Sequence, residues 1–388
     1  MKGIVTFPEV KNICVVIASR ANYGRLKSVL KAIKEHPRLN LQLVAGASAL
    51  LSRFGNVRKI MQDDGFKIDA EVNFIMEGAT PLTMAKSTGI GLMELPTIFN
   101  ILKPDIVLTH ADRFETISTA IAATYMNIPL AHTQGGELTG SIDESVRHAI
   151  TKMSHIHFPA TEISRKRIIS MGENPEFVFN TGCPSLDMLS KTPGKIPADF
   201  FEQAGGTGEP LNPDKPYILV LQHPVTTEYG SGRLQITQTL MALQGLRMQT
   251  FMMWPNPDAG SEDVAKGIRV FREHNRNIKN MQFVKNLPVE DYAILLKNTS
   301  CVIGNTSSGL REASFFGTPA VNIGSRQQLR ERSENVVDTA YDYCEIMKAA
   351  RSQLEKGRYP SSSLYGDGKA GKKIAEILAG IKELPIQK

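Results

Sequence analysis

Acidic, amide and basic side chains gather in three short patches between apolar runs in the first half of the chain. The patches cover residues 112–115, 132–137 and 141–148. The first two each follow an apolar run that is typical of a buried strand, at residues 106–109 and 127–131. Open parallel α/β sheets hold their ligands at the carboxyl ends of the strands. We therefore expect the three patches to line one crevice.

The candidate catalytic side chains in these patches are Asp112, Arg113, Gln134, Glu137 and Asp143. Positioned carboxylates can take up and return protons during a reaction. An aspartate directly before a helical pattern, as Asp112 is, can also be an ordinary helix cap. The other charged side chains that follow within the same patches favour a site over a cap.

Three more polar residues of the patches have two open interpretations. His132 ends a strand beside two glycines, so it either supports the turn or contacts a ligand. Arg147 lies one helical turn after Asp143 and can orient it. Arg147 and His148 can equally form only the polar side of a helix.

A strand–loop–helix unit begins the chain, with the strand expected over residues 12–18 and the loop over 19–24. The glycine pattern of dinucleotide-binding loops, Gly-x-Gly-x-x-Gly, is absent from this loop. Arg20 stands where glycines would otherwise admit a pyrophosphate. The loop therefore argues against NAD or FAD and for a phosphate that is held partly by a side chain.

The second half of the chain repeats the strand–helix alternation. Polar residues at the ends of its strands are the binding candidates His223, Asn256, Ser307 and Ser308. The last two belong to a loop at 304–309, which opens a helix expected over 310–316. The first N–H groups of a helix can bind a pyrophosphate. An ordinary glycine-containing turn is the alternative interpretation of this loop.

Composition limits the function classes. With 388 residues, 41% hydrophobic and 22% charged, the chain is typical of a soluble globular protein of two domains. A net charge of +6 without a lysine or arginine block gives little support to nucleic-acid binding, and it suits an anionic small ligand. The cysteines at 14, 183, 301 and 344 form no metal or redox motif, and no apolar run is long enough for a membrane span. We expect a cytoplasmic protein with reduced thiols, no membrane contact and no metal site.

The alternation of strands and helices predicts parallel sheets that are covered on both faces. We expect an N-terminal domain at 1–190 and a C-terminal domain at 191–368, which begins with a proline- and glycine-rich connection. The run at 320–323 is expected to close the second sheet. A lysine-rich amphipathic helix is expected at 369–388, packed across the outside.

Eight motifs in one order carry a resemblance to a known family. They lie at residues 19–24, 112–115, 135–137, 141–145, 147–152, 181–185, 223–227 and 304–309. This order, from about residue 12 to about residue 340, resembles the hydrolysing UDP-N-acetylglucosamine 2-epimerases, which supply precursors of sialic and legionaminic acids. The resemblance implies an α/β fold of the GT-B type, with two Rossmann-like domains facing each other across a cleft. It also implies a homodimer, with UDP bound mostly to the second domain, Glu312 at the ribose diol and Arg326 at the substrate.

In that family the C2 proton of the sugar is removed, UDP leaves C1 on the opposite face, and water adds to the glycal. No cofactor, metal or covalent nucleophile is implied. Asp112 and Asp143 match two acidic positions of the family, but the third is Gln134, which cannot exchange protons at neutral pH. Either Glu137 or Asp143 takes the second role, or Gln134 contacts a substituent of a different sugar. The candidate substrates that the resemblance implies are UDP-N-acetylglucosamine and UDP-N,N'-diacetylbacillosamine. A GT-B glycosyltransferase and an inactive UDP-sugar-binding protein are the competing hypotheses.

Overall fold

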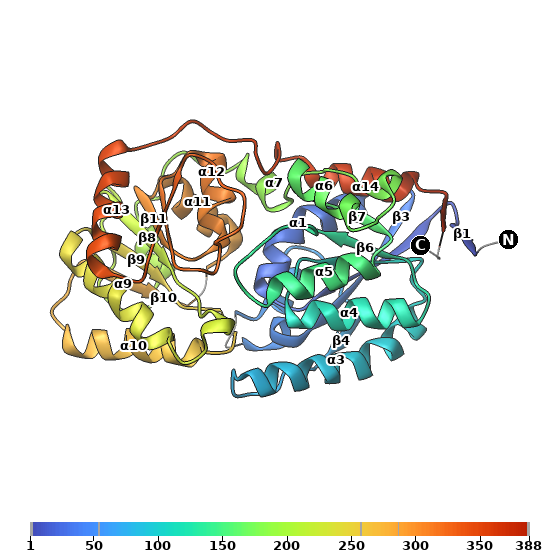
Figure 1. Cartoon of the computed structure of the whole chain (residues 1–388), viewed down its shortest axis with the longest axis horizontal. Coiled ribbons are helices and arrows are strands. Elements are labelled where there is room, and N and C mark those ends of the chain that lie inside the picture. The colour runs from blue at the N-terminus through green and yellow to red at the C-terminus, as the bar shows by residue number, and fades with distance from the viewer. Residues whose placement is uncertain (1–2, 53–54, 257, 286, 386–388) are drawn as a thin grey trace.

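The computed structural model describes residues 3–52, 55–256, 258–285 and 287–385. Figure 1 shows two α/β halves side by side along the long axis of the molecule. The strands of the first half are β1 (Ile4–Thr6), β2 (Lys11–Ile17), β3 (Leu39–Gly46), β4 (Ala70–Val72), β5 (Ile106–His110), β6 (Leu130–Thr133) and β7 (Ile156–Phe158). Its helices are α1 (Arg20–Glu35), α2 (Val57–Asp63), α3 (Pro81–Leu102), α4 (Phe114–Tyr125), α5 (Asp143–Met153), α6 (Glu162–Ser170) and α7 (Ser185–Leu189), with short 3-10 helices η1 (Ala47–Leu50) and η3 (Pro175–Phe177).

The second half begins after the connection that contains α8 (Phe200–Ala204). Its strands are β8 (Tyr217–Leu221), β9 (Gln249–Met253), β10 (Met281–Val284), β11 (Cys301–Gly304), β12 (Ala320–Ile323) and β13 (Val336–Thr339). Its helices are α9 (Gly232–Leu246), α10 (Ser261–His274), α11 (Val289–Asn298), α12 (Glu312–Phe316) and α13 (Tyr343–Lys356), with 3-10 helices η4 (Thr226–Glu228) and η5 (Ser307–Gly309). The chain ends with α14 (Ala370–Gly380) and β14 (Glu383–Pro385).

Both large sheets have the same topology. The first runs β4-β3-β2-β5-β6-β7 and the second β10-β9-β8-β11-β12-β13, and every neighbouring pair in them is parallel. Numbered along the chain within each sheet, both orders are 3-2-1-4-5-6, which is the order of the Rossmann fold. The order reverses between β2 and β5, and again between β8 and β11. Ligands of such sheets bind at the carboxyl ends of the strands near this reversal.

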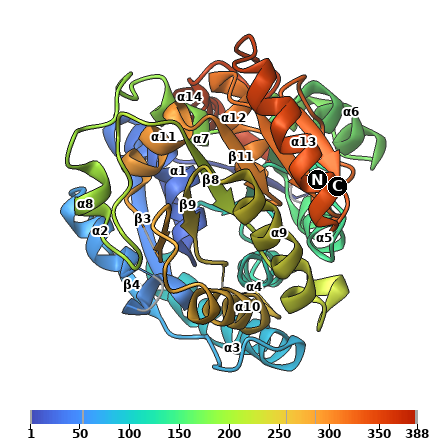
Figure 2. The ribbon, with the colours of Figure 1, turned by 90° about the vertical axis from the view of Figure 1, so that its left-hand side faces the viewer.

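The central strands are apolar on both faces because helices cover both sides of each sheet. In β8, Ile218 and Val220 pack with α9, α10 and α13, whereas Leu219 and Leu221 pack with α11 and α12. Figure 2 shows α9, α10 and α13 on one side of the second sheet and α11 and α12 on the other. This two-sided burial explains why β8 is a continuous apolar run in the sequence.

The sequence predicts that the strand at 320–323 closes the second sheet, but in the structure the sheet has one further strand. β13 continues it as a parallel edge strand on β12, with Val336 opposite Ala320. The expectation was wrong because β13 is short, and its side chains are partly or largely exposed, so it lacks the apolar run of a buried strand. Edge strands of this kind carry little periodic signal.

The C-terminal segment returns to the first half of the molecule. On α14, Ile374, Ala375 and Leu378 are buried in the core that contains α1 and β2. β14 pairs antiparallel with β1, so the described ends of the chain lie together, as Figure 1 shows. The bounds expected for the domains and for this segment stay predictions. No helix in the described part of the chain is long and apolar enough to cross a membrane.

Candidate active site

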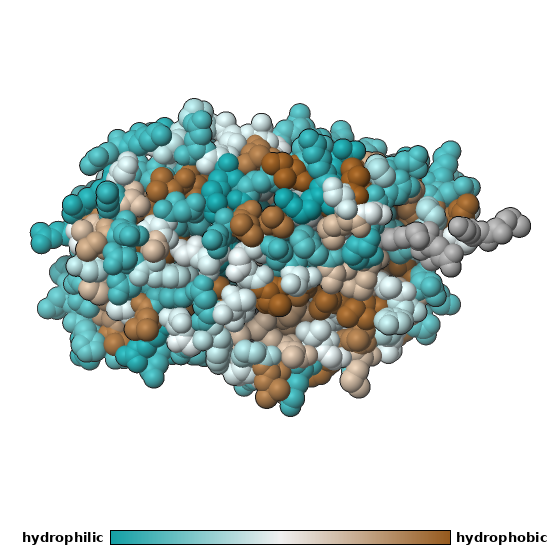
Figure 3. Space-filling view, in the orientation of Figure 1, coloured by the Kyte–Doolittle hydropathy of each residue, from teal (hydrophilic) through white to brown (hydrophobic). Residues whose placement is uncertain are grey.

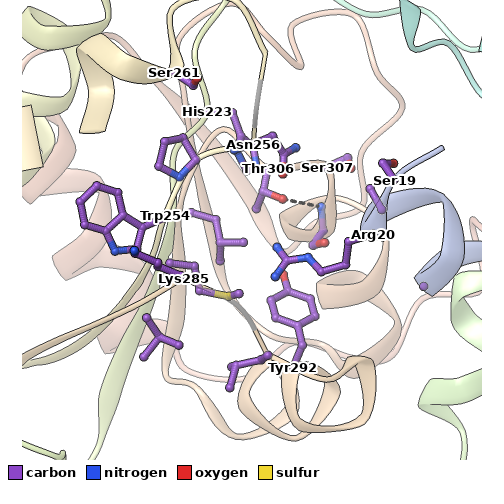
Figure 4. A pocket seen from close by; sticks show the side chains of 18 of the residues that line it. Ser19, Arg20, His223, Trp254, Asn256, Ser261, Lys285, Tyr292, Thr306 and Ser307 are labelled. Atoms are coloured by element: carbon purple, nitrogen blue, oxygen red, sulfur yellow. Dashed lines mark hydrogen bonds between the residues drawn. The ribbon is translucent and has the colours of Figure 1, made fainter. Parts of the chain in front are cut away.

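A cavity of about 1030 Å³ lies between the two domains, where the carboxyl ends of both sheets meet. Of the residues predicted from the sequence, those that line it are Arg20, Asp112, Arg113, Asp143, His223, Asn256, Ser307, Ser308, Glu312 and Arg326. Figure 4 shows Arg20 of the first domain facing Ser307 and Tyr292 of the second across this space. The structure therefore brings the first acidic patch and the second-domain loops to one place.

Asp112 follows β5 in a strained turn. Ala111, directly before it, has a φ of 59°, which a residue with a Cβ rarely adopts. His132 Nε2 donates to the carbonyl oxygen of Ala111 at 2.8 Å and holds this turn. On its other side the Asp112 carboxylate pairs with the Arg147 guanidinium, which is 1% exposed. His132 and Arg147 are thus behind the cavity wall and support Asp112.

Asp143 begins α5 and also lines the cavity. Burial raises the pKa of Asp143 above its ordinary value, and Asp258 adds to the rise, whereas Arg326 and Arg113 oppose it. A carboxyl group of this kind retains its proton to a higher pH than an exposed aspartate does. Such a group is suited to proton transfer.

Arg113 is fixed by carboxylates from both domains. Its Nη1 donates to Asp258 Oδ1 at 2.7 Å, and its Nε donates to Glu115 Oε2 at 3.1 Å. Burial by itself lowers the pKa of Arg113, but Asp258 and Glu115 outweigh it and raise the pKa. Arg326 Nη2 lies 3.9 Å from the other oxygen of Asp258. One carboxylate of the second domain therefore lies between two arginines that line the cavity.

Two arginines of α1 face the loops of the second domain. Ser19 caps this helix by accepting the N–H of Asn22 at 3.2 Å, and Arg20 is its first residue. Arg25, not predicted from sequence, donates from Nη2 to Ser307 Oγ at 2.5 Å. The start of a 16-residue helix and two guanidiniums make this wall of the cavity positively charged. The sequence signal for this wall is a second arginine little more than one turn after the first.

The loop after β11 is tighter than the sequence predicts. Residues 307–309 form η5, and α12 starts only at Glu312, so the expected helix over 310–316 is shorter. The N–H of Ser308 is bonded to Thr306 Oγ1 at 3.3 Å, which leaves the hydroxyls of Ser307 and Ser308 as the principal groups at the cavity. Glu312 is 6% exposed, and its Oε2 accepts no hydrogen bond from the residues that the structure describes. This oxygen can accept a ribose hydroxyl.

The buried environment of His223 favours the neutral form of its ring. Burial chiefly lowers its pKa to about 3, and Arg326 contributes. The N–H of Asn256 donates to His223 Nδ1 at 3.1 Å, so the ring proton is on Nε2. Asn305 holds the backbone of His223 through two bonds, of 2.7 and 2.8 Å. An Nε2–H group is thereby fixed in the cavity wall.

The other sequence candidates do not line the cavity: Gln134, Glu137, His132, Arg147 and His148. Gln134 is fully buried, accepts a bond from Arg311 Nη1 at 2.5 Å and donates to Cys183 Sγ at 2.9 Å. Glu137 is buried against Arg311 and Arg330 of the second domain. Their catalytic roles stay predictions, as does a substrate contact of His148, whose side chain is only partly buried.

The sequence did not reveal the partners that the second domain supplies. Arg311, Arg330 and Asp258 are buried, and none follows an apolar run in a way that marks a site. Trp254, Lys285 and Tyr292 also line the cavity (Figure 4). Within the described ranges, no three His, Cys, Asp or Glu side chains form a group that could hold a metal ion.

Two Rossmann-like domains that face each other across this cavity define a GT-B-like protein. The sequence profile described as UDP-N-acetylglucosamine 2-epimerase matches residues 31–379, and the chain belongs to this family. Both the family and the fold expected from the sequence are confirmed.

The chain is similar to two named relatives over most of its length. It is 36% identical to UDP-N,N'-diacetylbacillosamine 2-epimerase (hydrolyzing) of Legionella pneumophila, over 96% of each chain. It is 32% identical to GDP/UDP-N,N'-diacetylbacillosamine 2-epimerase (hydrolyzing) of Campylobacter jejuni, over 85% of this chain and 84% of the other. The crystal structure of UDP-GlcNAc 2-epimerase from Neisseria meningitidis bound to UDP-GlcNAc matches with a TM-score of 0.78 and 19% identity, over 95% of this chain and 99% of that one.

Proposed function

We propose that the protein is a hydrolysing 2-epimerase, which converts a UDP-2-acetamido sugar to UDP and the free 2-epimer. One observation carries this proposal. Asp112 and Asp143 of the first domain line the same cavity as Ser307 and His223 of the second. A sugar nucleotide whose diphosphate lies at the second-domain loops would present its sugar ring to the two carboxylates.

The residues of the cavity can be given distinct roles in this reaction. Asp112, oriented by Arg147, removes the C2 proton, and UDP leaves C1 from the opposite face of the ring. The Arg20 and Arg25 guanidiniums and the Ser307 hydroxyl stabilise the charge that grows on the leaving diphosphate. Asp143, whose pKa is raised towards the protonated form, then protonates C2 on the other face as water adds to C1. The Asp143 carboxylate takes up the proton that the added water loses, and Asp112 returns its proton to solvent.

We propose UDP-N,N'-diacetylbacillosamine as the first substrate to test, because both named relatives act on N,N'-diacetylbacillosamine nucleotides. UDP-N-acetylglucosamine is the second. Gln134 gives no support to either sugar, since its amide is bonded to Arg311 and Cys183 behind the cavity wall. The free 2-epimer would supply legionaminic acid synthesis in the first case and sialic acid synthesis in the second.

The test is to incubate the pure protein with each UDP-sugar in D2O, without added metal, and to follow the products by proton NMR. We expect free UDP and a 2-epimerised sugar with deuterium at C2. Release of UDP without deuterium at C2 would refute the elimination route and favour a glycosyltransferase without its acceptor. Binding of UDP with no turnover of any UDP- or GDP-linked 2-acetamido sugar would favour an inactive binding protein.

We further propose a homodimer that forms through α3. Three of the exposed residues of this 22-residue helix are large and apolar: Leu82, Met93 and Ile101 are 63, 77 and 69% exposed, and the helix carries only Lys86 and Glu94 as charged residues. Figure 3 shows apolar surface along the lower side of the molecule, where α3 lies in Figure 1. Large apolar side chains exposed along one helix favour association. Light scattering should give twice the chain mass for the wild type and the monomer mass for Met93→Lys; a monomeric wild type would contradict the proposal.

A cytoplasmic location is also proposed. The four cysteines are unpaired in the structure, and Cys14, Cys183 and Cys301 are buried as thiols. Unpaired thiols are typical of a reducing compartment. Fractionation of the producing cell should place the protein with cytoplasmic enzymes, and recovery from a secreted fraction would contradict the proposal.

A further inference from the structure

Four residues form a continuous path from the second domain to the cavity wall: Arg311, Glu137, Arg147 and Asp112. Arg311 Nη2 donates to Glu137 Oε2 across the domain boundary. Arg147 Nη1 donates to the main-chain oxygen of the same glutamate at 2.6 Å, and its Nη2 pairs with Asp112 Oδ2. Arg311, Glu137 and Arg147 are 1, 3 and 1% exposed. Water therefore has almost no access to the path.

The charges that hold Glu137 come from the other domain. Arg311 and Arg330 both approach Glu137 Oε2, the latter at 3.3 Å. Burial by itself would raise the pKa of Glu137, but these two arginines outweigh it and hold the pKa below the ordinary value. If the domains moved apart, Glu137 would lose both partners. Its carboxylate would then be hydrated and no longer held by fixed donors, so the Glu137 segment would lose a constraint on its geometry.

Arginine suits a path of this kind because its planar fork fixes two acceptors at once. Arg311 holds Gln134 and Glu137 with its two terminal nitrogens, and Arg147 holds the Glu137 carbonyl and Asp112 with its own. A displacement of Arg311 therefore changes the geometry at Asp112. Lysine, with a single ammonium on a flexible stem, cannot transmit it in the same way.

We propose that Arg311, Glu137 and Arg147 are positioning residues that make the placement of Asp112 depend on contact between the two domains. The inference rests on the proposed function, in which Asp112 is the base. It assigns Glu137 a role other than proton transfer. Its consequence is that Asp112 reaches its working position only when the cavity is closed by both domains, as sequestered active sites require.

Glu137→Gln is the first variant to test, because it keeps the shape of the side chain and removes the charge that meets Arg311 and Arg330. We expect kcat to fall at least about tenfold, with KM and the Kd of UDP changed less than about threefold, as expected when only the reactive geometry is lost. Hydrogen exchange of residues 135–140 should become faster in the presence of saturating UDP. Glu290→Gln is the matched control, since Lys27–Glu290 is also an ion pair between the domains, at 2.6 Å, but Glu290 is 49% exposed.

Arg311→Lys is the second variant. It leaves the Glu137 carboxylate in place, and it provides a test if Glu137→Gln does not fold. It should lower kcat and change KM little, as in Glu137→Gln, because one ammonium cannot hold both Gln134 and Glu137. Unchanged kcat in a folded variant would overturn the inference, and so would an equal loss in Glu290→Gln. Absence of C2 deuteration by the wild type would refute the proposed function instead, so the two failures are distinguishable.

Discussion

Asp112→Asn separates catalysis from structure at the candidate base. The substitution removes the carboxylate charge but leaves an oxygen that accepts a bond from Arg147. We expect kcat to fall about 100- to 10,000-fold, the usual contribution of a positioned acid or base. The Kd of UDP should change little, because the loops expected to hold UDP belong to the second domain.

The cost in stability follows from the burial of the pair. Arg147 is 1% exposed and Asp112 is 15% exposed as side chains. Removal of one partner of a buried ion pair costs about 3–5 kcal/mol, and the retained oxygen and the partial exposure reduce this to roughly 2–3 kcal/mol of unfolding free energy. For domains of this size the melting temperature should fall by roughly 4–12 °C.

The assay measures UDP release at saturating substrate, UDP affinity by calorimetry and melting by differential scanning fluorimetry. Asp64→Asn is the matched control, because Asp64 pairs with Lys27 at 2.8 Å in the same domain but does not line the cavity. It should lose stability without losing kcat. If UDP affinity falls in Asp112→Asn as far as kcat does, Asp112 is a structural residue and the reasoning is refuted.

Three further substitutions test other parts of the cleft. Asp258→Asn removes a negative charge that raises the pKa of Asp143, so the variant favours the anionic form of Asp143. The limb of the kcat–pH profile that reports Asp143 should therefore move to lower pH. A shift to higher pH would contradict this assignment. Gly140→Ala places a Cβ 1.9 Å from the carbonyl oxygen of Ser325 in the other domain. We expect at least a tenfold loss of kcat and a larger radius of gyration in solution scattering. Wild-type kcat would show that the backbone at Ser325 can move away at little energetic cost. Gln134→Glu adds a carboxylate beside Arg311, outside the cavity, and kcat should stay within about threefold of the wild type; a larger gain would mean that position 134 takes part in proton transfer.

The alternation of apolar runs was sufficient to predict most of the parallel core. β12 has the expected bounds, because Pro319 and Gly324 delimit its short run. The sequence was less informative at the edges of the sheets. β10 is short and lies between polar residues, and β1 and β14 pair only because the two ends of the chain meet in space.

The residues of the candidate site also fall into a group that the sequence predicts and a group that it does not. Residues that directly follow a strand, such as Asp112 and His223, were predicted because the carboxyl end of a parallel strand has a known place in the fold. Residues that reach the site from the other domain, such as Arg311 and Asp258, were not. Their position depends on how the two domains face each other, and no local pattern encodes that geometry.

The position of Gln134 shows why the contacts between domains matter for the chemistry. Judged from the motif alone, an amide at this point suggests either a lost catalytic group or a new substrate contact. In the structure its oxygen accepts from Arg311, whose other terminal nitrogen donates to Glu137. Arg311 and Arg330 thus meet a single carboxylate, and that carboxylate belongs to the segment that orients Arg147. An amide here spares a second buried charge while it still fixes the Arg311 fork, so the substitution is compatible with an active enzyme in which Asp112 and Asp143 transfer the protons.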